Sequence, residues 1–213
     1  MIVRTMTENG QTLALRQRGD VLDLVLGHVV LLSSAALETE RAFGRLAERA
    51  MKANEASRVL VGGLGFGSTL RGVLEVAPAD ACILVVEKLA TVIDVARREA
   101  AHLVAGALDD PRVVLEQGDV ADVIARESNL SAILLDVDNG PEWASFRSNA
   151  RLYADAALAR AREALLPGGF FAVWSGYSRD AFVASLRRSG FTPSIEPLAE
   201  RGVVRARAYV GVR

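Results

Sequence analysis

The sequence has few of the residues from which disulfides and metal sites are built. Only one of its 213 residues is cysteine, so no disulfide can form within the chain. Cys82 lies in an apolar run, and we expect it to be a small buried core residue. His28 and His102 form no metal-ligand cluster with a single cysteine, and we read both as surface or turn residues. The composition predicts no metal site, although a site of carboxylates alone would leave no such signature.

Long apolar runs are also missing. No stretch approaches the roughly 20 apolar residues of a membrane span, and the N-terminus lacks the apolar core of a signal peptide. Lys and Arg number 25 against 26 Asp and Glu, so the net charge gives no reason to expect nucleic acid or an anionic membrane as a partner. These absences predict a soluble, cytoplasmic protein.

Apolar residues are plentiful, at 51% of the chain, which is enough for a two-sided core. Residues 11–33 predict a short β meander, because alternating apolar residues are interrupted by turns at 18–20 and at Gly27. The expected strands are 12–16, 21–26 and 29–32. Three short strands are marginally stable alone, so the meander must pack on the rest of the chain or on a second copy. We therefore divide the chain into a small N-terminal β meander, 1–36, and a main domain, 37–213.

From residue 37 onward, helical and strand patterns alternate. The expected helices are 37–53, 68–76, 90–105, 120–127, 150–165 and 179–189. The expected strands are 58–62, 82–87, 112–116, 131–136, 170–175, 191–197 and 203–212. Repeated strand–helix units predict a parallel sheet with helices on both faces. The last two strands have no helix between them, so they predict an antiparallel hairpin at the sheet edge. The fold class is α/β: Rossmann-like, with seven mostly parallel strands.

The main domain is organised around a glycine-rich turn after its first strand. The four glycines of this turn are Gly62, Gly63, Gly65 and Gly67. Glycines in such density cost backbone entropy, so we expect them to let the backbone pass close to a ligand. Tight packing of strand on helix without a ligand is the alternative. A helix that begins at Gly67 or Ser68 would point free N–H groups back at the turn.

Acidic residues end the next three strands. Glu87 lies about 20 residues beyond Gly67, where a carboxylate can accept hydrogen bonds from two ribose hydroxyls. Asp119 is placed to reach the exocyclic amine of adenine, and Asp136 ends its strand beside the reacting centre. Because ligands of open α/β sheets bind outside the carboxyl ends of the strands, these residues and the glycines predict one nucleotide-sized slot.

The spacing of the glycines indicates the kind of nucleotide. Gly63, Gly65 and Gly67 read G-x-G-x-G, whereas a dinucleotide turn reads G-x-G-x-x-G and brings a pyrophosphate onto the helix end. The observed spacing favours a nucleoside that carries no phosphate. A dehydrogenase is therefore a weak alternative, since neither its glycine motif nor a hydride-handling residue is found.

Taken together, these segments resemble a known family. Residues 58–175 resemble the class I S-adenosylmethionine-dependent methyltransferase fold and, more narrowly, its spermidine synthase (aminopropyltransferase) branch. The resembling segments are 61–71, 85–87, 110–113, 118–119, 134–136 with Pro141, and 165–169. The resemblance implies that Glu87 holds the ribose and that Asp119 holds the adenine. It also implies that Asp136 accepts a proton from the attacking amine. It also implies S-adenosylmethionine or its decarboxylated form as cofactor. With an apolar meander that needs a partner surface, it implies a homodimer.

Three positions depart from the pattern of that family. Gly65 stands where the family has an aspartate for the propylamine of the cofactor, and Asn139 where its active-site loop has a second acid. Segment 33–40 contains no Tyr or His to match the Tyr-His-Glu segment of the family. Asp138 could substitute as a charge partner for a cationic substrate, or it could pair with Asp136 in an ordinary turn.

Residues beyond the fourth strand are further candidates. Trp174 and Tyr177 could cover the donor or sort substrates by cation–π contact, with ordinary packing at the sheet edge as the alternative. Together with Asn139 they are the expected substrate residues. Asn149 fits the N-cap of the next helix, and Tyr153, in the first turn of that helix, is expected to pack.

The sequence therefore predicts a spermidine synthase-like transferase that moves an aminopropyl or methyl group from an S-adenosylmethionine-type cofactor to a small acceptor. An amine is the expected acceptor, with polyamines among the candidates, because a carboxylate such as Asp136 can take the proton that an amine must lose. The alternative is a catalytically inactive nucleoside-binding or interaction protein on the same fold, which the departures at Gly65 and 33–40 permit.

Overall fold

A seven-stranded sheet runs through the centre of the main domain in the computed structural model, which describes residues 1–53, 57–137, 144–178 and 180–213. Within these residues its strands lie in the order β10-β11-β9-β8-β5-β6-β7. The strands are β5 (Arg58–Gly62), β6 (Cys82–Glu87), β7 (Val113–Gln117), β8 (Leu130–Leu135), β9 (Leu165–Ser175), β10 (Thr192–Glu200) and β11 (Val203–Val212). Strands β5 to β9 are parallel, and β11 is antiparallel to both β9 and β10. The predicted fold class and the antiparallel hairpin at the edge are confirmed.

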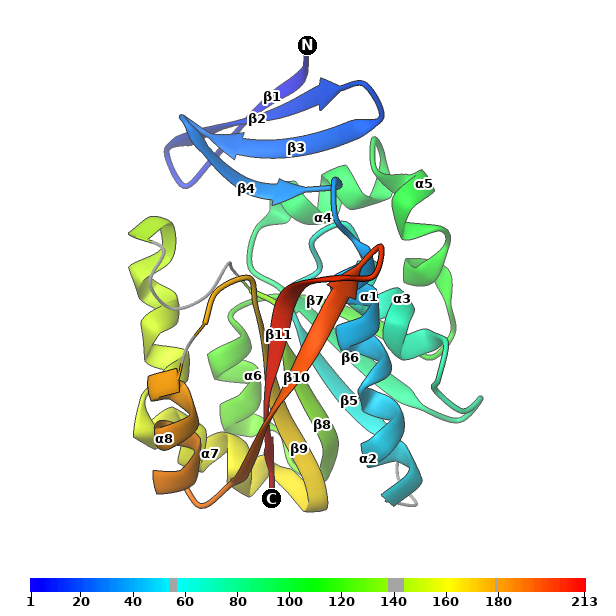
Figure 1. Cartoon of the computed structure of the whole chain (residues 1–213). Coiled ribbons are helices and arrows are strands. Elements are labelled where there is room, and N and C mark those ends of the chain that lie inside the picture. The colour runs from blue at the N-terminus through cyan, green and yellow to red at the C-terminus, as the bar shows by residue number, and fades with distance from the viewer. Residues whose placement is uncertain (54–56, 138–143, 179) are drawn as a thin grey trace.

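Helices cover both faces of this sheet and bury an apolar layer on each (Figure 1). One face carries α1 (Glu38–Arg45), α2 (Ala47–Ala53), α3 (Ser68–Leu74), α4 (Ala90–Arg97) and α5 (Ala101–Val104). The other carries α6 (Val120–Arg126), α7 (Asp155–Ala164) and α8 (Asp180–Arg188). Two 3₁₀ segments, η1 (Ala107–Asp109) and η2 (Ala144–Tyr153), complete the helical elements of the described residues. The order of the parallel strands reverses between β5 and β8, which is where ligands bind in sheets of this kind.

The helix that follows the glycine turn is held by a very close crossing with α1. A Cβ atom on Gly44 of α1 would lie 2.1 Å from the Thr69 carbonyl oxygen, and one on Gly72 of α3 would lie 2.1 Å from the Arg41 carbonyl oxygen. The two backbones are therefore in contact, and no other residue type fits at either position. This crossing fixes α3, and with it the end of the glycine turn, against α1.

Before the main domain, four antiparallel strands form a separate sheet in the order β1-β2-β3-β4. They are β1 (Ile2–Glu8), β2 (Gln11–Arg18), β3 (Val21–Leu26) and β4 (Val29–Ser33). The prediction of three strands was wrong because it missed β1. The turn between β1 and β2 is Asn9-Gly10, with φ of 52° and 74°. Asn-Gly is the strongest short hairpin signal, since both residues tolerate positive φ.

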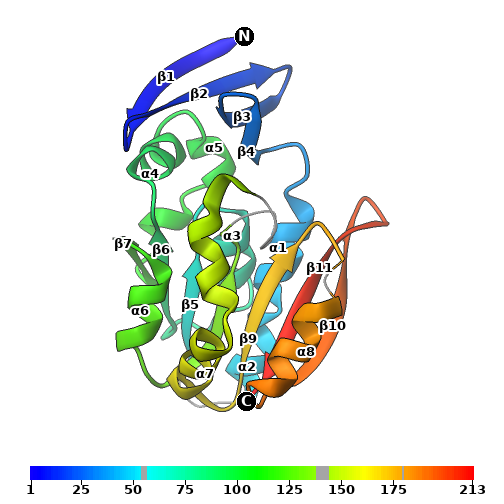
Figure 2. The ribbon, with the colours of Figure 1, turned by 90° about the vertical axis from the view of Figure 1, so that its left-hand side faces the viewer.

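This N-terminal sheet packs on the main domain, above the carboxyl ends of the parallel strands (Figure 2). Leu15 and Leu22 lie in one buried cluster with Phe66 of the glycine turn and Val95 of α4. Packing on the main domain was one of the two predicted outcomes, and it is the one found. The division of the chain at residue 36 stays a prediction.

Several local expectations need correction. Cys82 is exposed because it is the first residue of β6 and precedes the buried run that begins at Ile83. The predicted helix 37–53 breaks at Leu46, whose N–H bonds to the Phe43 carbonyl in a tighter turn. The predicted helix 150–165 is 3₁₀ in its first part, so α7 begins only at Asp155, and Asn149 is not its N-cap.

Other expectations hold. Tyr153 is buried and packs edge-on against Phe182 at 5.6 Å between ring centroids. His28 and His102 are both exposed. Among the described residues, no helix is long and apolar enough to cross a membrane.

Candidate functional site

A cleft of about 910 Å³, partly open to solvent, lies at the carboxyl ends of β5, β6, β7 and β8. Three of its sides come from the main domain, through the glycine turn, the segment after β6, and the ends of β7 and β8. The fourth is an apolar wall, 29–32, supplied by β4 of the N-terminal sheet. The cleft lies where the sequence predicted the slot, at the carboxyl ends of the parallel strands. The N-terminal sheet, which the sequence predicted only as a small meander, forms one of its walls.

Gly63 brings two strand ends into contact at the base of this cleft. Its φ is 94°, its N–H donates to the Val86 carbonyl at 2.8 Å, and a Cβ there would lie 2.1 Å from the Asp136 carbonyl oxygen. Gly65 has a φ of 52° and more room, since its Cβ would meet only Leu32 Cδ2, at 3.7 Å. Both glycines line the cleft as predicted.

The other two glycines of the turn are explained by packing. A Cβ on Gly62 would lie 2.8 Å from the side chains of Leu135 and Val120, and one on Gly67 would lie 3.3 Å from Val104. Neither glycine is among the residues that line the cleft within the described chain. Helix α3 does begin after Gly67, which has a φ of 79°. A cofactor-binding role for Gly62 and Gly67 stays a prediction, and packing alone accounts for both.

Glu87 is held in place by backbone groups on two sides. Its Oε2 accepts the Leu64 N–H and its Oε1 accepts the Leu89 N–H, each at 2.9 Å, and the side chain is nearly buried at the cleft wall. Burial raises the pKa of Glu87 above its ordinary value, and the backbone donors partly oppose that rise. A carboxylate has about four lone-pair positions, and the Leu64 and Leu89 N–H groups use one on each oxygen.

The Asp119 carboxylate accepts hydrogen bonds from three groups of the chain itself. Its Oδ1 accepts the Ala121 N–H at 3.0 Å and so caps α6, while Oδ2 accepts from Lys88 at 3.0 Å and from Arg151. Burial would raise the pKa of Asp119, but these donors outweigh it and the pKa is lowered. Asp119 lines the cleft where predicted, already paired with two cations. An adenine amine would have to share this carboxylate with them.

Asp136 lies at the other end of the cleft, after β8. Its backbone N–H donates to the Gly62 carbonyl at 2.8 Å, and its Oδ2 accepts the Thr69 hydroxyl at 2.6 Å. The same hydroxyl contacts the Glu40 carbonyl at 3.3 Å. Burial, together with the negative charges of Asp136 and Glu200, raises the pKa of Glu40 well above its ordinary value. Carboxyl groups of α1 and of the β10–β11 hairpin therefore lie close enough to Asp136 or to each other to interact electrostatically.

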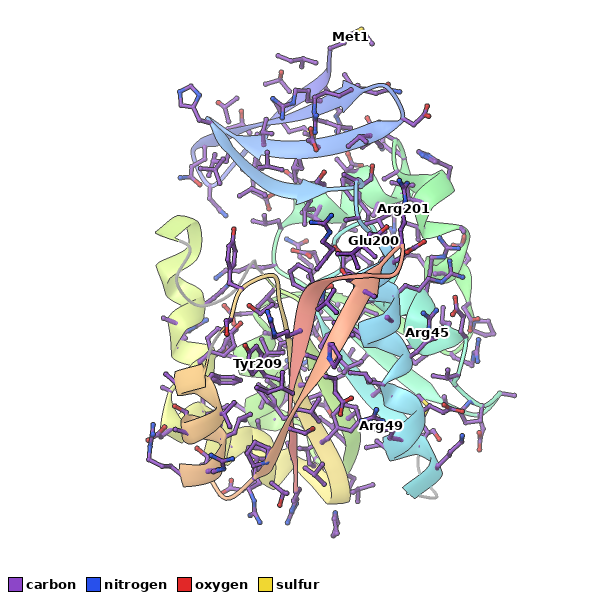
Figure 3. The ribbon with its side chains drawn as sticks, in the orientation of Figure 1. Met1, Arg45, Arg49, Glu200, Arg201 and Tyr209 are labelled. Carbon is purple, nitrogen blue, oxygen red and sulfur yellow. The ribbon has the colours of Figure 1, made fainter. Side chains whose placement is uncertain are left out.

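The tip of the β10–β11 hairpin contacts the start of α1, the helix that carries Glu40. Glu200 and Arg201 form this tip beside the start of α1 (Figure 3). The Glu38 N–H donates to Glu200 Oε2, and the Arg201 N–H donates to Glu38 Oε2, each at 2.9 Å. These reciprocal bonds fix the first turn of α1, which has no side-chain cap of its own.

Two of the predicted substrate residues, Trp174 and Tyr177, lie within the described chain. Trp174 is partly buried against the core, and its Nε1 has no hydrogen-bond partner among the described residues. Tyr177 is 50% exposed beyond the end of β9. Neither lines the cleft within the described chain. Asp138 and Asn139 lie outside the described residues. A substrate role for Trp174, Tyr177 and Asn139 stays a prediction, and so does a catalytic role for Asp138.

Several cleft residues were not predicted from the sequence. The sequence pattern at 29–32 indicates only a strand. Nothing in the sequence distinguishes Lys88 from an ordinary charged residue that follows Glu87. Asn149 lines the cleft from η2, where the sequence indicated a helix cap. Glu40 does not line the cleft but interacts with Asp136, 96 positions later in the sequence, and its amphipathic helix pattern does not indicate this. Only the fold brings these residues together.

Comparison with known proteins defines the fold. No protein-family model matches the chain, and no curated protein matches it. Among solved structures, spermidine synthase from Thermotoga maritima matches with a TM-score of 0.77 at 17% identity, over 99% of this chain and 72% of that one. A spermidine synthase in complex with the transition-state analogue AdoDATO matches with a TM-score of 0.76 at 16% identity, over the same shares. Human methyltransferase-like protein 13 in complex with SAH matches with a TM-score of 0.62 at 22% identity, over 82% of this chain and 81% of that one.

These likenesses place the chain in the class I S-adenosylmethionine-dependent methyltransferase fold. More narrowly, it has the spermidine synthase form of that fold, because the matches to spermidine synthases extend over the N-terminal sheet as well. The resemblance read from the sequence is confirmed at the level of the fold.

Proposed function

We propose that the cleft binds the nucleoside part of an S-adenosylmethionine-type cofactor and that the chain is a transferase. The observation that carries this proposal is the Glu87 carboxylate, which two backbone N–H groups aim at the cleft wall beside Gly63 and Gly65. A carboxylate at the end of β6 suits the hydroxyls of a ribose. The structural neighbours that carry AdoDATO and SAH support the same class of ligand.

The reacting end of the cleft fits an amine acceptor. When bound, a sulfonium cofactor supplies an electrophilic carbon to the nucleophile. An amine attacks only when neutral, and it must lose a proton after transfer, which a positioned carboxylate can take. Asp136 is the candidate base, oriented by the Thr69 hydroxyl. The Asp136 carboxylate, which lines the cleft, also favours a cationic acceptor, so polyamines are the first acceptors to try.

Three finer features belong to the same proposal. We propose a homodimer, supported by the exposed apolar side chains of Ile2 and Val3 on the edge strand β1. We propose a cytoplasmic location and a small-molecule acceptor without nucleic acid or membrane. The near balance of 25 basic and 26 acidic residues supports this last point.

Calorimetric titration with S-adenosylmethionine, its decarboxylated form, methylthioadenosine and NAD tests the proposal. We expect micromolar binding of at least one adenosyl sulfur compound and none of NAD, because the turn lacks the dinucleotide spacing. Preference for the decarboxylated form would indicate aminopropyl transfer, and preference for S-adenosylmethionine would indicate methyl transfer. Binding of a nucleoside without turnover of any amine would favour the inactive alternative. Binding of none of the four would reject the proposal.

Changing Asp136 to Asn should keep cofactor binding and remove turnover. The amide still accepts the Thr69 hydroxyl, so the local geometry survives, but it cannot take a proton from the acceptor. We expect a loss of about a hundredfold or more in kcat, the usual contribution of a general base. Single-turnover kinetics with a diamine acceptor measures the effect. Unchanged turnover would show that another group is the base.

A further inference from the structure

The segment that leads from β6 into α4 is held from the N-terminal sheet. The Ala90 N–H donates to Glu8 Oε1 at 2.7 Å, and the Thr91 N–H donates to Glu8 Oε2 at 2.9 Å. Glu8 is the last residue of β1, 82 positions earlier in the chain. Both oxygens of one carboxylate thus bind consecutive amides at the start of α4.

Helix α4 needs this carboxylate because it has no cap of its own. The first N–H groups of a helix have no partner within the helix, and the N-cap residue of α4, Leu89, offers no side-chain acceptor. A carboxylate at this position also interacts favourably with the positive end of the helix dipole. Glu8 therefore does from another sheet what a Ser or Asp at the N-cap would do locally.

The amides that Glu8 binds lie within the stretch that forms the cleft. Residues 86–89 and Val92 line the cleft, whereas Ala90 and Thr91 do not. The Leu89 N–H, next to these two amides, donates to Glu87 Oε1. The chain from Glu87 to Thr91 is therefore bound by two carboxylates, one that faces the cleft and one from the N-terminal sheet.

A second contact fixes β1 along α4. Arg4 lies on the same face of β1 as Glu8, four residues earlier, and its guanidinium pairs with Asp94 at 2.5 Å and with Glu99 at 3.3 Å. The position of Glu8 thus depends on the docking of the whole sheet, and β4 of that sheet supplies the wall 29–32 of the cleft.

We propose that Glu8 is a positioning residue for the nucleoside cleft, acting through the Ala90 and Thr91 amides on the Glu87 carboxylate. The N-terminal sheet is then part of the site in two ways, as a wall and as the anchor of the ribose-binding segment. This inference rests on the proposed function. The inference goes beyond the proposed function by assigning a positioning role to Glu8, a residue that does not line the cleft.

Glu8→Ala tests this role, with Glu99→Ala as the matched control. The control also removes one carboxylate that pairs with Arg4 of β1, here from the segment after α4. It leaves the two amides bound to Glu8, and the ion pair between Arg4 and Asp94 remains. The nucleoside used is the adenosyl compound that the wild-type protein binds in titration. Affinity, thermal unfolding, amide hydrogen exchange at 89–92, and KM against kcat are measured for each protein.

We expect Glu8→Ala to weaken nucleoside affinity roughly five- to tenfold, the size of a lost helix cap. The KM for the nucleoside should rise with kcat nearly unchanged, and exchange at 89–92 should be faster without ligand. Glu8→Gln, which keeps one strong acceptor oxygen, should recover part of the affinity. Glu99→Ala should match the wild type in affinity and in exchange at 89–92.

Three results would overturn the inference, and they differ from one another. If the wild type binds adenosyl compounds and Glu8→Ala binds them equally well, the positioning role is wrong and the proposed function stands. If the wild type binds none of them, the proposed function and the positioning role fall together. Equal losses of affinity in Glu8→Ala and Glu99→Ala would also reject a specific role for Glu8, because docking of the sheet would then explain both.

Discussion

Replacing Glu87 with Ala should abolish nucleoside binding, with a fall in affinity of roughly a hundredfold or more. Two charge-assisted hydrogen bonds to ribose hydroxyls are lost, each worth about 1.5–3 kcal/mol. The change also leaves the Leu64 and Leu89 N–H groups without the acceptor that arranges the glycine turn and the segment after β6. Titration calorimetry measures the loss. If the variant binds the nucleoside with wild-type affinity, Glu87 does not hold the ribose.

The wild-type protein should also show a pH dependence that Glu87 explains. Burial raises the pKa of this carboxyl above its ordinary value, so it becomes protonated at a higher pH than an exposed glutamate does. Only the ionised form accepts with both oxygens, and nucleoside affinity should therefore fall as pH decreases through that raised pKa. Because the pKa is raised, ionisation costs folding stability, so Glu87 favours the fold most at low pH and less as pH rises through its folded pKa.

The variant Glu87→Gln separates the charge from the geometry. Its amide oxygen can accept one of the two backbone N–H groups, and it carries no buried charge, so thermal stability near neutral pH should be close to that of the wild type. Nucleoside affinity should lie between those of the wild type and Glu87→Ala, and it should no longer vary with pH in the acidic range. A pH profile that matches the wild type would assign the titration to another group.

The parts of the fold that the sequence predicted best are those specified by local pattern. The bounds of β5 and β6 are as predicted, because each is an apolar run that ends at a glycine or at a charge, Gly62 and Glu87. Glu87, Asp119 and Asp136 fall at the same edge of the sheet because parallel strands share a direction. The prediction needed only the strand ends and the rule for parallel sheets.

What could not be predicted depends on contacts between distant segments. The hydrogen bond from the Ala90 N–H to Glu8 joins residues 82 positions apart, and no sequence pattern near either residue indicates it. The pairing of Asp119 with Arg151 depends on η2, whose sequence resembles that of an ordinary helix. Cys82 was misread because periodicity shows which residues alternate but not at which residue the buried layer begins.

Gly63 should be the least replaceable of the four glycines in the turn. An added Cβ would lie 2.1 Å from the carbonyl oxygen of Asp136 and 2.8 Å from the carbonyl carbon, and a backbone cannot yield as a flexible side chain does. Relief of the clash requires the ends of β5 and β8 to part, where the Asp136 N–H bonds to the Gly62 carbonyl at 2.8 Å. The φ of 94° adds strain for any residue with a side chain.

We therefore expect Gly63→Ala to lower the free energy of unfolding by about 3 kcal/mol or more, the size of effect seen for steric clashes in a packed interior. For a chain of this length that is a fall in Tm of about 6–12 °C. Nucleoside binding should be lost in the protein that remains folded, because Asp136 and the turn move apart. Thermal unfolding followed by circular dichroism, together with titration below the transition, measures both effects.

Gly65→Ala is the matched control, because it also places a side chain at positive φ but without the clash. Its φ of 52° is also in the left-handed region, but the nearest atom to its Cβ is Leu32 Cδ2, at an ordinary contact distance of 3.7 Å. We expect a loss of about 1–2 kcal/mol from the backbone conformation alone. The difference between the two variants isolates the contact between Gly63 and Asp136. If both variants lose the same stability, the close approach of β5 and β8 does not constrain the site, and the reason for a glycine at 63 must be sought in ligand contact alone.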